Sequence, residues 1–227
     1  MSTLEQLNQE IVSCTRCPRL VTYREAVARD KRRMYQDWDY WGRPVPGFGD
    51  EAARVLILGL APAAHGANRT GRMFTGDGSG DWVWRTLHKY GFANHPSSRH
   101  RDDGLAVTDV YITASLRCAP PRNRPLAQEL SGCRPYLLAE LELLDRVRVV
   151  VALGKIAFDS CLAAFSALKY KLPNPRPRFG HGLTYPLAPG LTLVASYHPS
   201  RQNTQTGKLT REMFDQIFET VRQFLRP

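Results

Sequence analysis

Apolar and polar stretches alternate along the chain in a way that predicts four strand-then-helix units. Short apolar runs at 55–58, 107–116, 147–154 and 191–197 are typical of strands buried on both faces. Each run is followed by apolar residues at helical spacing, at 82–90, 125–144, 156–165 and 208–225. Repeated units of this kind build parallel sheets. We therefore predict an α/β fold, a three-layer sandwich with a central, mainly parallel four-stranded sheet flanked by helices, in one domain over residues 1–227.

The segment between the first predicted strand and its helix, residues 59–80, is long and rich in glycine. A long loop without periodicity is more often functional than an ordinary surface loop, and glycine lets the backbone approach a ligand closely. This loop carries one aromatic ring, Phe74, and one carboxylate, Asp77. Asp81, which follows it, is expected to cap the next helix. We therefore expect a ligand site at this loop.

Polar residues gather at the ends of three predicted strands: in loop 59–80, in loop 117–125 with Asn123, and in the loop that begins at His198. These ends meet at one edge of a parallel sheet, where open α/β sheets hold their ligands. An amide and a ring suit the reading and stacking of an extruded base, and a carboxylate and an imidazole suit hydrolysis of its bond to the sugar. The sequence contains no phosphate-binding glycine motif and no serine nucleophile elbow.

The charge balance favours a polyanionic partner. Lys and Arg number 31 against 21 Asp and Glu, which leaves a net charge of +10. Nucleic acid is the first expectation and an anionic membrane surface the second. Segment 19–41 interleaves Arg and Lys with Tyr and Trp, and it fits either a solvated basic face over packed aromatics or direct DNA contact. No apolar run is long enough to span a bilayer and the first residues do not form a signal peptide, so we expect a cytoplasmic protein.

Four of the five cysteines form a candidate metal site. Cys14 and Cys17 make a C-x-x-C pair after a short predicted helix, and Cys118 and Cys133 flank the second predicted strand and its helix. Thiolates in this order suit either a tetrahedral zinc ion or an iron–sulfur cluster, and their spacing does not separate the two. Cys161 lies inside an apolar helical segment, where a buried core thiol is expected.

Two segments resemble the signature motifs of uracil-DNA glycosylases. The first joins Gly59-Leu60-Ala61-Pro62 to Phe74-Thr75-Gly76-Asp77, and the second runs from Tyr197-His198-Pro199-Ser200 to Gly207. Segments 43–49 and 117–121 also look like the B-type, or family 5, iron–sulfur enzymes of bacteria and archaea. The similarity extends from Cys14 through the last helix. The chain is thus similar to a single uracil-DNA glycosylase-like domain over residues 1–227.

This resemblance implies a monofunctional hydrolase of base excision repair. Such an enzyme cleaves the N-glycosidic bond of uracil in DNA, and of other deaminated bases such as hypoxanthine, and leaves an abasic site. Its partner would be uracil-containing duplex DNA with the damaged base turned into the pocket. Cys14, Cys17, Cys118 and Cys133 would hold a mainly structural 4Fe-4S cluster. No association with a membrane is expected, and the protein is expected to act as a monomer.

By the same resemblance, two residues would carry the chemistry. Asp77, ionised, would stabilise the sugar cation and orient water, and His198 would donate a hydrogen bond to uracil O2. The base would stack on Phe74, meet Asn123 at its edge and contact the backbone amides of Leu60 and Ala61. The loop after His198 would press into the minor groove. The implied DNA contacts are Pro199, Ser200, Arg201, Gln202, Asn203, Lys208 and Arg211.

One position departs from the sister families, and two alternatives remain. The third residue of the first motif is often Asp or Asn in those families, whereas here it is Ala61, which moves the catalytic burden onto Asp77. Ala61 and the long loop favour the B-type over a sister glycosylase such as the A-type uracil enzymes. The rival from another class is a nonenzymatic nucleic-acid-binding module stapled by zinc. It accounts for the charge and the cysteines, but not for Asp77 and His198 at neighbouring strand ends.

Overall fold

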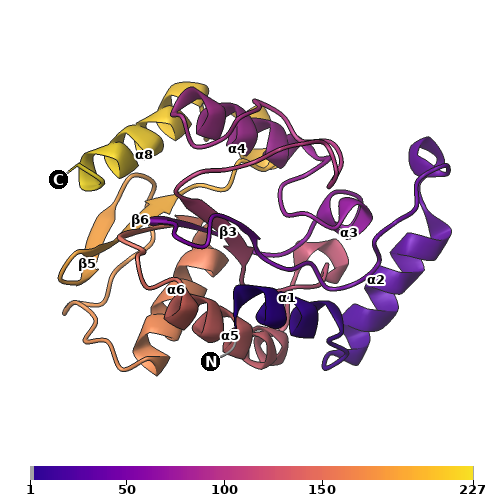
Figure 1. Cartoon of the computed structure of the whole chain (residues 1–227), viewed down its shortest axis with the longest axis horizontal. Helices are drawn as coiled ribbons and strands as arrows, with labels where there is room; N and C mark the ends of the chain where they lie inside the picture. Colours follow the sequence, from indigo (N-terminus) through magenta and orange to yellow (C-terminus); the bar gives the residue numbers. More distant parts are fainter. Residues whose placement is uncertain (1–2, 227) are drawn as a thin grey trace.

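A six-stranded sheet lies between two layers of helices in the computed structural model, which describes residues 3–226 (Figure 1). The strands follow the spatial order β1-β3-β2-β4-β6-β5. Their bounds are β1 Phe48–Gly49, β2 Val55–Gly59, β3 Val110–Ala114, β4 Val149–Leu153, β5 Thr184–Ala188 and β6 Leu191–Ser196. β3, β2, β4 and β6 are parallel, whereas the edge strands β1 and β5 run antiparallel to their neighbours. The carboxyl ends of the four parallel strands therefore share one edge of the sheet.

Helices cover both faces of this sheet and confirm the predicted three-layer α/β class. On one face lie α4 (Gly78–Lys89) and α8 (Arg211–Phe224), and on the other lie α1 (Leu4–Val12), α5 (Ala127–Leu143) and α6 (Lys155–Ala167) (Figure 1). The remaining helical segments are α2 (Pro18–Asp30), η1 (Arg33–Tyr35), α3 (Ala67–Thr70), η2 (Pro121–Asn123) and α7 (Arg201–Gln205). Within residues 3–226 no helix combines the length and apolarity that crossing a bilayer demands.

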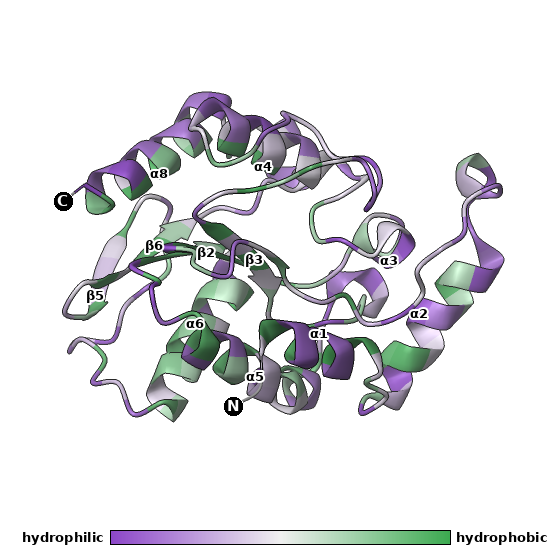
Figure 2. Ribbon diagram, viewed as in Figure 1, coloured by the Kyte–Doolittle hydropathy of each residue, from purple (hydrophilic) through white to green (hydrophobic). Residues whose placement is uncertain are grey.

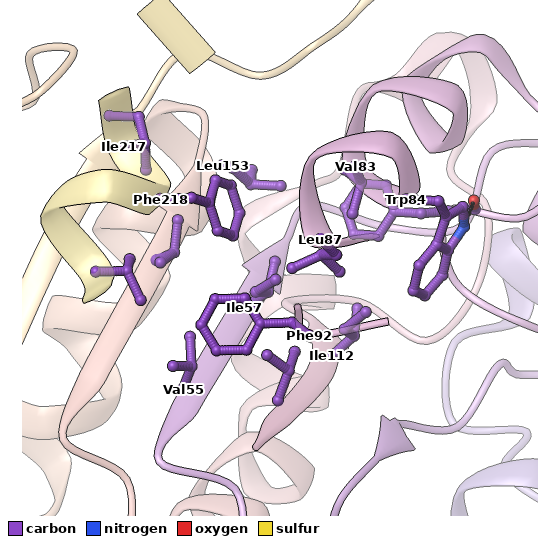
Figure 3. Close-up of a cluster of buried hydrophobic side chains, with 14 of the residues drawn as sticks. Val55, Ile57, Val83, Trp84, Leu87, Phe92, Ile112, Leu153, Ile217 and Phe218 are labelled. Carbon is purple, nitrogen blue, oxygen red and sulfur yellow. Dashed lines mark hydrogen bonds between the residues drawn. The ribbon is translucent and has the colours of Figure 1, made fainter. Parts of the chain in front are cut away.

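The central strands are apolar because both of their faces are covered. Every residue of β2, β3 and β4 is buried, and Figure 2 shows β2 as hydrophobic below α4 and α8, whose outer sides are hydrophilic. On the α4–α8 face, the side chains of Val83, Trp84 and Leu87 pack with Phe218 over the strand residue Ile57 (Figure 3). A second apolar cluster joins α1, α5 and α6 to the opposite face. Packing from both sides fixes the strands and, with them, the loops at their ends.

The sequence predicts four strands, and the two additional strands, β1 and β5, both lie at the edges of the sheet. β1 has only two residues and follows a turn-rich segment, so it carries no periodicity of its own. β5 has one buried residue, Leu187, and contains Pro186, a residue that weakens any strand assignment. The predicted last helix also began too early, since α8 starts at Arg211 and residues 201–205 form the separate short helix α7. These differences leave the parallel core of the prediction unchanged.

Candidate active site

A cavity of about 850 Å³ opens at the carboxyl ends of β2, β4 and β6. Its wall is built from the loops that follow β2, β3, β4 and β6, which approach one another because the parallel strands end at one edge. The six residues that the sequence analysis assigned to catalysis and to the base all line it: Leu60, Ala61, Phe74, Asp77, Asn123 and His198. The expected meeting of the three loops is therefore observed.

Asp77 is the N-cap of α4, a position that the sequence analysis wrongly gave to Asp81. Its Oδ1 accepts hydrogen bonds from the backbone N–H groups of Ser79 and Gly80, both at 2.9 Å. Within residues 3–226 no hydrogen bond reaches Oδ2, and that oxygen lies so close to Gly66 that a Cβ there would overlap it. Burial raises the pKa of Asp77, and the two backbone hydrogen bonds oppose that effect. One carboxylate oxygen is thus fixed, and the other is available to a ligand.

His198 follows β6 and faces the same cavity with a neutral ring. Burial lowers its pKa to about 4, so the imidazole is uncharged at neutral pH. The backbone around it is braced by Asn203, whose Nδ2 donates to the carbonyl oxygen of His198 at 2.8 Å. Gly154, at the end of β4, leaves room for it, since a Cβ there would lie 3.3 Å from the His198 Cβ. The site therefore holds a neutral hydrogen-bonding ring in a defined place.

Phe74 lies in the cavity wall with a strained backbone. Its φ is +52°, a conformation that few residues other than glycine adopt. Its carbonyl oxygen accepts a hydrogen bond of 2.6 Å from the indole N–H of Trp84, which holds the loop in this conformation. Its ring centroid is 6.2 Å from that of His198. This strained backbone conformation places the aromatic ring of Phe74 in the cavity wall.

Asn123 lies at the rim of the cavity in another strained turn. It and Arg122 have φ values of +56° and +54°, so two successive residues are left-handed. The Asn123 side chain is exposed, and within residues 3–226 its side-chain amide forms no hydrogen bond, whereas its backbone N–H donates to the carbonyl oxygen of Pro120. Its donors and its acceptor are therefore available to a ligand.

The loop after His198 supplies the polar rim. Ser200, Arg201, Gln202, Asn203 and Lys208 line the cavity, and Ser200 caps α7 by accepting a hydrogen bond from the Asn203 N–H. The other two expected DNA contacts lie off the cavity wall. Pro199 is buried beneath the loop, and the guanidinium of Arg211 packs 3.7 Å above the Trp82 ring.

Sequence reasoning missed part of the cavity wall. Gly154 and Lys155 follow β4, and a glycine at the junction of an apolar strand and a helix was a usable signal. Arg122 and Arg124 flank Asn123 and are cations beside a residue already chosen. Phe179 arrives from a proline-rich linker far along the chain, and nothing in its local pattern points to the site.

The four cysteines of the candidate metal site come together beside β3. Cys14 follows α1, Cys17 is the N-cap of α2, Cys118 follows β3 and Cys133 lies in α5. Their charges act on one another: Cys14 raises the pKa of each of the other three, after burial as the larger cause. Cys161 lies apart in the apolar core, as expected, and burial alone raises the pKa of its thiol.

These four thiols are the ligand set that zinc sites and iron–sulfur clusters share. Within residues 3–226, no group of three His, Cys, Asp or Glu side chains already has metal-binding geometry. Buried Arg24 donates a hydrogen bond of 3.0 Å to the Cys118 Sγ, and a cation at this place suits a negatively charged, thiolate-ligated centre. The chemistry of the residues present therefore fits a thiolate-ligated metal centre.

Comparison with known proteins gives one consistent result. Residues 46–222 match the family described as the uracil DNA glycosylase superfamily. The chain is 51% identical over 219 residues to the Type-5 uracil-DNA glycosylase of Mycobacterium bovis, covering 96% of this chain and 80% of the relative. It is 51% identical over 213 residues to that of Thermus thermophilus, covering 94% of each. The corresponding protein of Pyrobaculum aerophilum is 48% identical over 207 residues, or 91% of this chain and 87% of the relative.

Proposed function

The chain belongs to the uracil DNA glycosylase superfamily, and we propose that it excises uracil from DNA by means of Asp77 and His198. It is a hydrolase that cleaves the N-glycosidic bond and acts in base excision repair. The observation that carries the assignment of roles is the convergence of three groups on one cavity: the half-bonded carboxylate of Asp77, the neutral imidazole of His198 and the ring of Phe74. The product is an abasic site.

Breaking this bond leaves negative charge on the base and positive charge on the sugar. Asp77 Oδ2 takes a proton from the attacking water and faces the sugar cation, while Oδ1 stays bound to the α4 backbone. Because burial raises the pKa of Asp77, its carboxylate is a stronger base than an exposed aspartate. His198 donates its N–H to uracil O2, where the charge develops. A neutral ring suits this role, since it stabilises the leaving anion without being consumed as an acid.

The cavity wall holds the base in the remaining directions. Phe74 provides the stacking face, and the backbone amides of Leu60 and Ala61 contact the base from the end of β2. Asn123 reads the base edge with its side-chain amide, which has no competing partner among the described residues. A volume of about 850 Å³ admits a purine, which supports hypoxanthine as a further substrate.

The proposed nucleic-acid partner is a duplex from which the base is turned out. Arg201 and Lys208 at the rim neutralise phosphates, with Ser200, Gln202 and Asn203 contributing polar contacts to the same strand. Pro199 stiffens the loop that enters the minor groove, and Arg211 lies behind it on α8. One chain supplies the whole cavity wall, so the proposed active form is a monomer. The relatives named above come from prokaryotes, whose DNA lies in the cytoplasm, and the proposed location follows from that.

A 4Fe-4S cluster is proposed at Cys14, Cys17, Cys118 and Cys133. The gathering of the four thiols beside β3 and the guanidinium of Arg24 on Cys118 support it. When bound, the cluster supplies cross-links rather than chemistry at the cavity. It would tie the α1–α2 turn to α5 and to the loop that carries Asn123, and so hold the rim in place.

The first test is base release from a duplex oligonucleotide carrying one U opposite G. We expect release of uracil, release of hypoxanthine from a matched duplex, and a brown protein containing four iron atoms. A single-stranded oligonucleotide of the same sequence tests the proposed preference for a duplex. A colourless protein that binds DNA and releases no base would instead support a zinc-stapled binding module.

A further inference from the structure

The basic, aromatic-rich segment at residues 33–41 does not line the cavity. Two of its rings pack on Arg69, a residue that contacts the loop of Asp77. In η1 and the turn after it, Tyr35 and Trp38 hold the guanidinium of Arg69 against their rings. The Arg69 Cζ lies 4.0 Å from the centroid of the Tyr35 ring and 3.9 Å from that of Trp38. The two rings meet edge to face, 6.4 Å apart between centroids. Stacking of this kind orients a planar guanidinium.

Arg69 is buried in α3, and its remaining contacts are directed at the loop of Asp77. Its Nη2 donates to the carbonyl oxygen of Gly76 at 3.0 Å, one residue before Asp77. Its Nε donates to the carbonyl oxygen of His65 at 2.9 Å, one residue before Gly66, whose missing side chain leaves room for Asp77 Oδ2. The guanidinium thus bridges the two chain segments that border the carboxylate.

Tyr40 of the same segment extends this contact. Its hydroxyl lies 3.0 Å from Nδ1 of His65. His65 is therefore held twice, by Tyr40 at its side chain and by Arg69 at its carbonyl oxygen. Three aromatic residues of one segment therefore act on the two segments around Asp77, although none of them touches the cavity. We call Tyr35, Trp38 and Tyr40 the aromatic clamp.

Burying an arginine against two rings is energetically unfavourable compared with burying an apolar side chain there. Its charge loses hydration, and within residues 3–226 its Nη1 has no hydrogen-bond partner. A methionine would fill similar volume without that cost. Methionine would lack the fork, that is, the two hydrogen bonds from the guanidinium to the carbonyl oxygens of Gly76 and His65. It would also lack a positive charge near Asp77.

The charges around Asp77 also support a role for Arg69. Burial and the negative charge of Asp81 raise the pKa of Asp77, whereas the positive charge of Arg69 lowers it together with the Ser79 and Gly80 amides. The imidazole of His198 lines the same cavity and is neutral. Arg69 is thus a buried cation that favours the ionised carboxylate, and the other cations on the cavity wall are Arg122, Arg124, Lys155, Arg201 and Lys208.

We propose that Arg69, held by the aromatic clamp, is a positioning residue that fixes the Asp77 loop and keeps its carboxylate ready for water activation. This inference rests on the proposed role of Asp77. It gives segment 33–41 a task that is separate from contact with DNA.

The test compares single-turnover uracil release over a range of pH for wild type, Arg69→Met and Arg69→Lys. We expect Arg69→Met to lower the plateau rate by about 10- to 100-fold and to move the acidic limb of the profile to higher pH. Arg69→Lys keeps the charge but lacks the fork, so its limb should stay near that of wild type while its rate remains low. DNA affinity should be unchanged in both variants.

Arg222→Met is the matched control. Arg222 also stacks on a ring, 3.8 Å above Phe92, and donates to a backbone carbonyl, that of Tyr90 at 3.0 Å, but it lies on α8 away from Asp77. The Arg222→Met variant should be less stable than wild type, but the acidic limb of its pH profile should not shift. If Arg69→Met does not fold, Trp38→Leu, which removes one of the two rings that stack on Arg69 but keeps its charge, should lower the plateau rate more weakly and leave the acidic limb near that of wild type.

Two results would overturn the inference: an Arg69→Met profile that superimposes on wild type, or a shift that Arg222→Met reproduces. Either leaves the proposed function standing as long as wild type releases uracil. If wild type releases none, the proposed function itself fails.

Discussion

At the scale of single residues, Asp77 has two tasks that one substitution separates. As N-cap it needs an acceptor oxygen for the Ser79 and Gly80 amides, and as catalyst it needs a negative charge. Asparagine caps helices about as well as aspartate, but it carries no charge and accepts no proton. Asp77→Asn should therefore lower single-turnover uracil release by about 10²- to 10⁴-fold, while the melting temperature and the Kd for duplex DNA hold.

Asp81→Asn is the control for that experiment. Asp81 lies in the first turn of the same helix and removing it changes the net charge equally, but it does not cap the helix. Its rate of uracil release should stay within a few-fold of wild type. Equal losses of rate and of DNA affinity in Asp77→Asn would contradict a catalytic role.

The neutral ring of His198 has a consequence for stability. Its pKa is about 4 in the folded protein and 6.5 when unperturbed, so between these values the unfolded chain binds a proton that the folded chain does not. Stability therefore falls as pH decreases through this window and levels off below it. At pH 5 the loss relative to pH 7 should be about 1–2 kcal/mol from this group.

Urea unfolding at pH 7 and pH 5 measures this loss. His198→Gln should reduce the pH dependence, whereas the exposed His95→Gln should leave it as in wild type. An unchanged difference between the two pH values in His198→Gln would show that the ring is not held neutral by its site.

The residues of the site differ in how far the sequence could predict them. Asp77, Asn123 and His198 follow apolar runs, so strand ends alone bring them to one edge. The cap assignment went to Asp81 because both aspartates precede helix-forming residues, and the choice depends on the backbone at Gly76, whose φ is +76°. Phe179 was not predictable, because it reaches the cavity through a linker whose path is set by tertiary packing.

At the scale of elements, a buried ion pair joins β3 to α5 beneath the cysteine site. Arg117 and Glu140 lie 2.5 Å apart with almost no exposure, and Thr113 donates to the same carboxylate at 2.7 Å. Arg117 Nε and Glu140 Oε1 nevertheless lack partners within residues 3–226. Removing one partner of such a pair strongly destabilises the folded protein, whereas replacing both partners with apolar residues of similar volume is often neutral or stabilising.

Arg117→Met should therefore destabilise the protein by about 3–5 kcal/mol, because Glu140 keeps a buried charge without its cation. The double variant Arg117→Met/Glu140→Leu should recover most of that loss. Urea unfolding of both proteins, prepared in the same way, measures the difference. A double variant as unstable as the single one would show that the pair contributes more than charge compensation.

The same element scale explains which strands were predictable. β2, β3 and β4 are covered on both faces and so consist of apolar residues throughout. β1 and β5 are held by pairing with one neighbour each, and backbone pairing leaves no hydropathy pattern in the sequence. The interior of the sheet was therefore predictable and its edges were not.

At the scale of the whole molecule, the net charge of +10 leaves open which cations meet DNA. Arg201 and Lys208 are exposed on the cavity rim. Arg146 and Arg148 are exposed just before β4, at the opposite edge of the sheet. Each pair contributes two positive charges, so removing either pair changes the net charge equally.

The dependence of DNA affinity on salt separates the two pairs. Each phosphate contact contributes a slope of about −0.9 to log K against log salt concentration. Arg201→Ala/Lys208→Ala should therefore lower the magnitude of the slope by about 1.8, whereas Arg146→Ala/Arg148→Ala should leave it near that of wild type. Fluorescence anisotropy with a uracil-free duplex at several salt concentrations provides the measurement without base release. Equal changes in both double variants would mean that the overall charge, rather than the rim of the cavity, attracts the DNA.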